Sequence, residues 1–158
     1  MSHRRSEPVM VPPAEGAVWQ VLGDAVVCKI SGDQTGGAYA VVETATPPGG
    51  GPPLHLHGRE DEFFYVLDGR LDIRCGNRTF TLEAGACAHL PRGVPHTFRN
   101  VGDALARMLV TLVPAGFERF FAQVDRLGRH GVPNMDEVAA LAGEFGLAFI
   151  AAETRAPG

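Results

Sequence analysis

Short runs of Val, Ile, Leu, Phe and Thr follow one another between Val18 and Pro114, and Gly, Pro, Asp or Asn separate them at close intervals. The clearest alternation is in residues 71–75, Leu-Asp-Ile-Arg-Cys, where one face is apolar and the other charged. This pattern predicts antiparallel β-structure. The runs that we expect to form strands are residues 19–22, 25–30, 38–46, 63–67, 71–75, 79–82, 87–90, 96–99 and 106–113.

So many strands predict a barrel or a two-sheet jelly roll, because closure of the sheets removes or shortens their exposed edges. A chain of 158 residues has room for one domain with a core of useful size. We therefore expect an all-β fold, with the barrel at residues 9–114 and a disordered lead-in at residues 1–8.

The hydrophobic period changes after Pro114 and becomes helical. One apolar stripe at this spacing is formed by Phe117, Phe120, Phe121, Val124 and Leu127. Asn134 followed by Glu137 has the form of a capping box, which predicts that a second helix begins there and runs to about residue 146. We expect residues 115–158 to form a helical extension whose aromatic face packs on the barrel.

The composition is that of an ordinary globular protein, with 45% hydrophobic and 20% charged residues. The formal charge of -4 and the pI of about 5.8 leave no excess of Lys and Arg to neutralise phosphates, which argues against a nucleic-acid partner. No run approaches the roughly 18 apolar residues of a membrane span. We therefore expect a small-molecule partner, and a homodimer is compatible with the sequence.

The three cysteines, Cys28, Cys75 and Cys87, are odd in number, lack C-x-x-C spacing and lie in expected strands. We interpret them as buried free thiols of a cytoplasmic protein, since the cytoplasm keeps thiols reduced. The basic residues near the N-terminus have no apolar run after them, so this segment does not resemble a signal peptide.

Four side chains of the types that bind metal ions stand out in the barrel region. His55 and His57 are one residue apart, so on an extended segment both imidazoles point to the same face. With Glu62 and His96 they would make a mixed nitrogen and oxygen site for one divalent ion, open to water or substrate. The alternative is that the histidines are core polar groups without a metal. Burying these four polar side chains with no metal ion to bind them would, however, be costly in free energy.

Two longer patterns resemble the motifs of the cupin superfamily. Residues 49–69 match G-x5-H-x-H-x3,4-E-x6-G, and residues 85–100 match G-x5-P-x-G-x2-H-x3-N at every fixed position. The resemblance implies a single cupin β-barrel, a double-stranded β-helix or jelly roll, with two short C-terminal helices in this chain. It also implies that the metal ligands are His55, His57, Glu62 and His96.

The acidic run Glu60-Asp61-Glu62 requires a choice, because the motif allows three or four residues before its carboxylate. Glu62 fits better, since it lies six residues before the closing Gly69. We expect Glu60 and Asp61 to be solvated charges on the rim. We expect Asn100, which closes the second motif, to tie down a turn through its side-chain amide.

Three further segments, PPGGGPPLHLH, REDEFFYVLDG and PAGFERFF, resemble small bacterial cupins grouped with quercetin 2,3-dioxygenases. In that family the glutamate takes the proton of a flavonol, and dioxygen then cleaves the heterocycle. The resemblance implies an enzyme, a metal-dependent dioxygenase of an aromatic or enolisable small molecule, with Glu62 as ligand and catalytic base. The donor set does not select among nickel, manganese, iron, cobalt, copper and zinc.

Two other functions stay open: a non-redox cyclase or isomerase of a polyketide-like or sugar-like substrate, and a ligand-binding cupin without turnover. Alternation also predicts a substrate pocket, because Phe64 shares a strand face with Glu62, and Phe98 shares one with His96. The orientation of His89 depends on the register of its strand, which the sequence does not determine.

Overall fold

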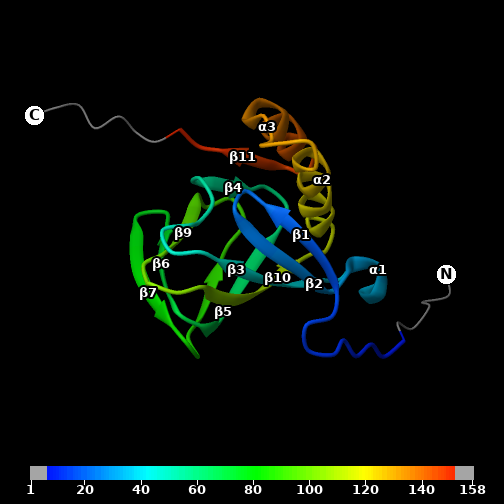
Figure 1. Cartoon of the computed structure of the whole chain (residues 1–158), viewed down its shortest axis with the longest axis horizontal. Coiled ribbons are helices and arrows are strands. Elements are labelled where there is room, and N and C mark those ends of the chain that lie inside the picture. Colours follow the sequence, from blue (N-terminus) through cyan, green and yellow to red (C-terminus); the bar gives the residue numbers. More distant parts are fainter. Residues whose placement is uncertain (1–6, 152–158) are drawn as a thin grey trace, which may run out of the picture.

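The computed structural model describes residues 7–151. Residues 1–6 of the expected lead-in at 1–8, and residues 152–158 of the expected extension at 115–158, lie outside this range. Two sheets enclose a common interior (Figure 1), and every pair of neighbouring strands is antiparallel. Their strand orders are β1-β2-β3-β10-β5-β8 and β11-β4-β9-β6-β7. The predicted all-β jelly roll is confirmed.

The strands of the first sheet are β1 (Ala17–Val21), β2 (Asp24–Ile30), β3 (Ala40–Thr46), β5 (Asp61–Asp68), β8 (Cys87–Leu90) and β10 (Ala106–Val113). Those of the second sheet are β4 (His55–His57), β6 (Arg70–Cys75), β7 (Arg78–Glu83), β9 (His96–Asn100) and β11 (Leu147–Phe149). The helices are α1 (Gly32–Thr35), α2 (Glu118–Gly128) and α3 (Met135–Glu144).

Three of these elements were not predicted, and all three are short. Strands β4 and β11 have three residues each and pair with one another, so neither shows an alternation long enough to recognise. Helix α1 has only four residues. The strand β11 returns the chain to the barrel after the two C-terminal helices.

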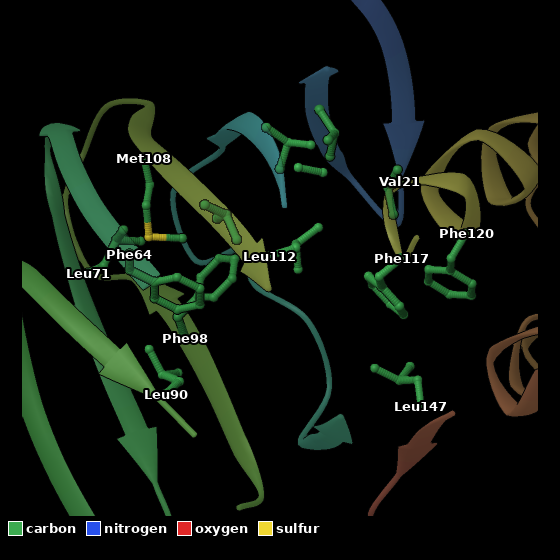
Figure 2. Packing of buried hydrophobic residues seen from close by; sticks show 14 of the residues in the cluster. Val21, Phe64, Leu71, Leu90, Phe98, Met108, Leu112, Phe117, Phe120 and Leu147 are labelled. Atoms are coloured by element: carbon green, nitrogen blue, oxygen red, sulfur yellow. The ribbon is translucent and has the colours of Figure 1, made fainter. Parts of the chain in front are cut away.

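The core follows the alternation of the strands. Along β5 the side chains of Glu62, Phe64 and Val66 are buried, and the residues between them are more exposed. Figure 2 shows two groups in the interior, one around Phe64 and the other around Phe117 near helix α2. Both groups belong to one continuous hydrophobic cluster, so the helices share the core of the barrel.

Helix α2 packs on β1 at one side of the barrel (Figure 1). Its first residue, Glu118, is buried and accepts hydrogen bonds from the backbone amides of Gly32 (2.8 Å) and Gly116 (2.6 Å). The carboxylate of Glu118 thus fixes the start of α2 against α1.

Helix α3 begins as expected at Asn134, whose side chain accepts a hydrogen bond from the amide of Asp136.

Asn100 stabilises a turn, as expected. Its amide nitrogen donates to the carbonyls of Thr46 and Ala104, and its side-chain oxygen accepts from the amide of Gly102. The residue is buried, and these three bonds join the end of β9 to the end of β3 and to the following loop.

The expectation that the three cysteines are buried is wrong, whereas the expectation that their thiols are free is confirmed. Cys28 and Cys75 are half-buried, and Cys87 is exposed, although all three thiols are free. Cys87 begins β8 at a position that faces outward, whereas Leu90 on the same strand is buried. In the described part of the chain no helix is long and apolar enough to cross a membrane.

A small polar group lies in the apolar interior. Asp24 is 9% exposed, and its Oδ2 accepts a hydrogen bond of 2.8 Å from the hydroxyl of Thr46. The hydroxyl of Thr44 is also buried, and it has no hydrogen-bond partner among residues 7–151. Burial raises the pKa of Asp24 from 3.8 to about 6, and the bond from Thr46 offsets part of that rise.

We predict that Asp24→Asn stabilises the protein above pH 6 and has little effect below pH 4. The folded chain binds the Asp24 proton more tightly than the unfolded chain. The stability that protonated Asp24 contributes is therefore fully present below pH 3.8 and is lost as the pH rises through 6. A pKa difference of about two corresponds to a loss of about 3 kcal/mol. Denaturant titrations between pH 4 and pH 8 would measure the free energies of unfolding.

The matched control is Asp68→Asn, at the exposed end of β5, which should leave the pH dependence of stability unchanged. If Asp24→Asn changed the free energy of unfolding equally at pH 4 and pH 8, the assignment of a raised pKa to Asp24 would be wrong.

Candidate metal centre

The structure brings the four predicted side chains to one place in the interior. His55 and His57 lie on β4, Glu62 lies on β5 of the other sheet, and His96 lies on β9. All four are buried, and one potential ligand atom from each lies within 4.8 Å of the others. His55 is directly paired with His96 across β4 and β9, so the register of these strands places two imidazoles side by side.

The carboxylate of Glu62 lies among the imidazoles. Its Oε2 is 2.6 Å from Nε2 of His96 and 3.4 Å from Nε2 of His57. The ring of His55 lies edge-on to both of the other rings, at centroid distances of 4.5 Å from His96 and 5.2 Å from His57. The Nε2 atoms of two rings therefore point to the same carboxylate oxygen.

The other nitrogens of two rings are held by the backbone. Nδ1 of His55 lies 2.8 Å from the carbonyl oxygen of Pro53, and Nδ1 of His96 lies 3.1 Å from that of Val94. A carbonyl can only accept a hydrogen bond, so Nδ1 carries the proton in both rings. Nε2 of each ring is therefore the nitrogen that faces the cluster and that a metal ion would bind, in place of the proton that His96 and Glu62 share.

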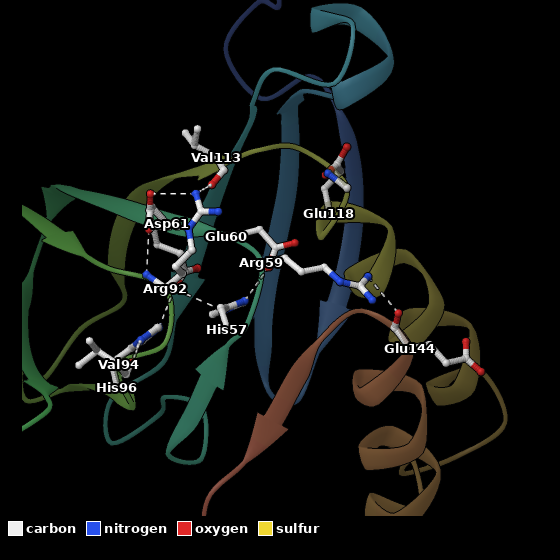
Figure 3. A network of polar contacts seen from close by, with 12 residues as sticks. His57, Arg59, Glu60, Asp61, Arg92, Val94, His96, Val113, Glu118 and Glu144 are labelled. Carbon is white, nitrogen blue, oxygen red and sulfur yellow. Dashed lines mark hydrogen bonds and ion pairs between the residues drawn. The ribbon is translucent and has the colours of Figure 1, made fainter.

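His57 differs, because its Nδ1 faces a carboxylate. Glu60 is only 4% exposed, and its Oε2 lies 3.4 Å from Nδ1 of His57 (Figure 3). The expectation that Glu60 is a solvated rim charge is therefore wrong. Glu60 lies two residues before Glu62, so its side chain points to the same side of the chain. Both facing atoms, Nδ1 and Oε2, are buried without a hydrogen bond among the described residues.

Asp61 and His89 both lie on the outside of the barrel. Asp61 is half-buried and binds the guanidinium of Arg92 at 3.1 Å, which lowers the pKa of Asp61 to about 2 (Figure 3). His89 is exposed on β8, where its ring stacks on that of Phe63 at 4.9 Å. The register of β5 and β8, which pairs these two residues, therefore keeps His89 away from the cluster.

The electrostatics of the cluster favour a neutral imidazole at His55 and an ionised carboxylate at Glu62. Burial, and after it the nearby His96, lower the pKa of His55 to about 4. Burial alone would raise the pKa of Glu62, but the neighbouring imidazoles of His57, His96 and His55, with the hydrogen bond that His96 shares with it, hold that pKa below its usual value. Neutral nitrogen and anionic oxygen are the protonation states that bind metal ions.

A cavity of about 90 Å³ adjoins the cluster, and His55, His57 and Glu62 form part of its wall. Phe64 and Phe98 also line it, and their rings meet edge to face at 5.8 Å. The structure thus places both predicted pocket residues beside the four candidate ligands.

Helix α2 and Phe117, the residue before it, supply a second aromatic wall of the cavity. The sequence predicts these aromatic residues only as packing on the barrel. Phe117, Phe120 and Phe121 line the cavity, and the ring of Phe117 lies edge-on to that of His57 at 4.4 Å. The helical stripe was a signal for these residues. The side of the barrel on which the helix packs was not predictable from it.

The chain resembles known proteins over about half of its length. The family model described as "Cupin domain" matches residues 42–112. Polyketide synthase CurC from Streptomyces cyaneus is 39% identical over 71 residues, which are 45% of this chain and 46% of that protein. Quercetin 2,3-dioxygenase from Bacillus subtilis (strain 168) is 28% identical over 92 residues, which are 58% of this chain and 27% of that protein. The matched regions thus span less than half the length of either relative.

A similar fold is found in a solved structure, the polyketide cyclase RemF from Streptomyces resistomycificus. It superposes with a TM-score of 0.60 at 24% sequence identity, covering 68% of this chain and 80% of that chain. The family match, the jelly roll and the positions of the two motifs agree with one another. Residues 42–112 of the chain therefore form a cupin domain.

Proposed function

We propose that this cupin is a metal-dependent dioxygenase that acts on a small aromatic or enolisable molecule. The observation that supports the proposal best is the position of four buried ligand atoms, within 4.8 Å of one another, beside a cavity with aromatic walls. The similarity to quercetin 2,3-dioxygenase of Bacillus subtilis supports this reaction class.

The four side chains fit one divalent transition metal ion. His55, His57 and His96 would supply imidazole nitrogens and Glu62 an oxygen, a donor set suited to nickel, manganese, iron, cobalt, copper or zinc. The hydrogen bonds at Nδ1 of His55 and His96 direct Nε2 inward, as metal binding requires. Such an ion, when bound, would polarise a coordinated oxygen and hold substrate and dioxygen side by side.

The residues of the chain have separate parts in this proposal. Glu62 accepts the proton of the substrate hydroxyl, because its carboxylate is ionised and lies at the cavity wall. Phe64 and Phe98 bind the apolar face of the substrate. The volume of about 90 Å³ favours a molecule with one aromatic ring over a three-ring flavonol.

Glu60 has a positioning part. Its carboxylate can accept a hydrogen bond from Nδ1 of His57, which would fix the tautomer with Nε2 free and hold the ring in place. This role would also satisfy the two buried atoms that lack a partner.

A second candidate is a non-redox metal-dependent cyclase of a polyketide-like substrate. The observation in its favour is the 39% identity to polyketide synthase CurC. The same cluster serves this reaction if Glu62 removes a proton next to a carbonyl and no dioxygen is consumed.

The first prediction for the site concerns metal content. His57→Ala should abolish stoichiometric metal binding, because one of four ligands is lost. Glu60→Ala should weaken metal affinity by about 10–100-fold, because it removes only the group that orients His57. Elemental analysis of protein purified without a histidine tag, followed by competition with a chelator, would measure both effects.

The matched control for Glu60→Ala is Glu83→Ala, at the exposed end of β7, which should retain full metal affinity. Full metal content in His57→Ala would show that the ligand assignment is wrong. Unchanged affinity in Glu60→Ala would remove Glu60 from the site.

The second prediction separates the two roles of Glu62. Glu62→Gln keeps the size of the side chain and one oxygen, but an amide is a poor base. Turnover per bound metal should fall by roughly 10²–10⁴-fold. Steady-state rates normalised to metal content would measure this fall. Equal losses of metal and activity would show that Glu62 acts only as a metal ligand and not as a base.

The third prediction concerns the reaction. Metal-loaded protein should consume dioxygen with a substrate from a panel of catechols, enediols, single-ring enols and flavonols, and the single-ring compounds should be preferred. An oxygen electrode with product analysis would test this. Metal-dependent conversion without dioxygen uptake would favour the cyclase, and binding without conversion across the panel would favour a ligand-binding cupin.

A further inference from the structure

The cavity has a second polar region that is separate from the four candidate ligands. Asp24 and Thr44 both line it, although most of its wall is aliphatic or aromatic. Polar groups in an apolar cavity orient and select ligands, because each one prefers a complementary partner to an apolar contact.

The register of strands β5, β10 and β3 places Asp24 and Thr44 at a different level of the barrel from Glu62. Glu62 lies opposite Leu112, and Leu112 lies opposite Ala40. Thr44 is four residues further along β3, a rise of about 13 Å. Asp24 lies beside the end of the same strand, where it accepts the hydrogen bond from Thr46.

The hydroxyl of Thr44 has unused hydrogen-bonding capacity. The residue is 6% exposed, and its Oγ1 is buried without a hydrogen-bond partner in the described part of the chain. Leaving such a group unsatisfied costs about 1–3 kcal/mol. Its neighbours across the sheet, Val26 and Met108, offer no polar side chain.

Asp24 also has capacity that the fold leaves unused. Its Oδ2 accepts the bond from Thr46, and a carboxylate has lone pairs for further hydrogen bonds. Burial raises the pKa of Asp24 to about 6, so at neutral pH the protein retains an unfavourable buried carboxylate. A role of Asp24 in ligand binding would explain why the protein contains a buried carboxylate that lowers its stability.

We propose that Asp24 and Thr44 form a second subsite of the cavity, which binds a hydroxyl group on the aromatic ring of the substrate. The carboxylate accepts the hydrogen bond of this hydroxyl, and the Thr44 hydroxyl donates to or accepts from the same oxygen. This inference rests on the proposed function for the aromatic class of the ligand, and the subsite adds that the ring carries a hydroxyl group.

The test uses two single-ring probes, phenol and benzene, which differ only in the hydroxyl. Isothermal titration calorimetry gives the ratio of their affinities for the wild-type protein. In the double variant Asp24→Asn, Thr44→Val, which changes side-chain size little, the preference for phenol over benzene should fall about tenfold, the equivalent of one good hydrogen bond. The affinity for benzene should stay within about twofold, which also shows that the cavity is intact.

The control is Thr111→Val, on the outward side of β10, which should leave the ratio unchanged. An unchanged ratio in the double variant would overturn the subsite, and so would failure of both probes to bind the wild-type protein. Because the probes need neither dioxygen nor turnover, a protein that consumes no dioxygen could still show the subsite, and the two proposals can fail separately.

Discussion

A carboxylate in the interior of an apolar barrel is stable only if other polar groups surround it, and Glu62 is such a carboxylate. Three imidazoles provide the surroundings, and they come from β4 and β9 of the sheet opposite to the one that contains Glu62. The two sheets therefore meet at this cluster through polar contacts as well as through the hydrophobic core. The positions of β4, β5 and β9 relative to one another are constrained by the same contacts that would hold a metal ion.

Much of the fold was predictable, because alternation on a half-buried strand is visible in the sequence. Strands β8 and β10 have the predicted bounds, and the buried row of Glu62, Phe64 and Val66 follows from a period of two. The strands β4 and β11 were not predicted, because three residues show no period. Their conformation depends on pairing with each other across a large distance in sequence.

The candidate site was predictable where spacing alone determined it. The two motifs selected the four side chains that the structure brings together. Glu60 was assigned wrongly, because an acidic run was interpreted as a solvated rim, although the period of two that places Glu62 inside also applies to Glu60. Asp24 was not identified at all, since Leu22-Gly23-Asp24 resembles an ordinary turn, and its burial depends on contact with a distant strand.

The pairing of β4 with β11 has a consequence for the order in which the molecule can be completed. His55 and His57 lie on a strand whose contact with β9 is a single residue pair, while β11 covers the full length of its other edge. During synthesis residues 147–149 leave the ribosome after every other strand in the described part of the chain, and well after His96. A nascent chain that already contains all four candidate ligands therefore still has β4 without its main partner. Stable capture of an ion by that strand would then require a chain that has been synthesised at least to residue 149.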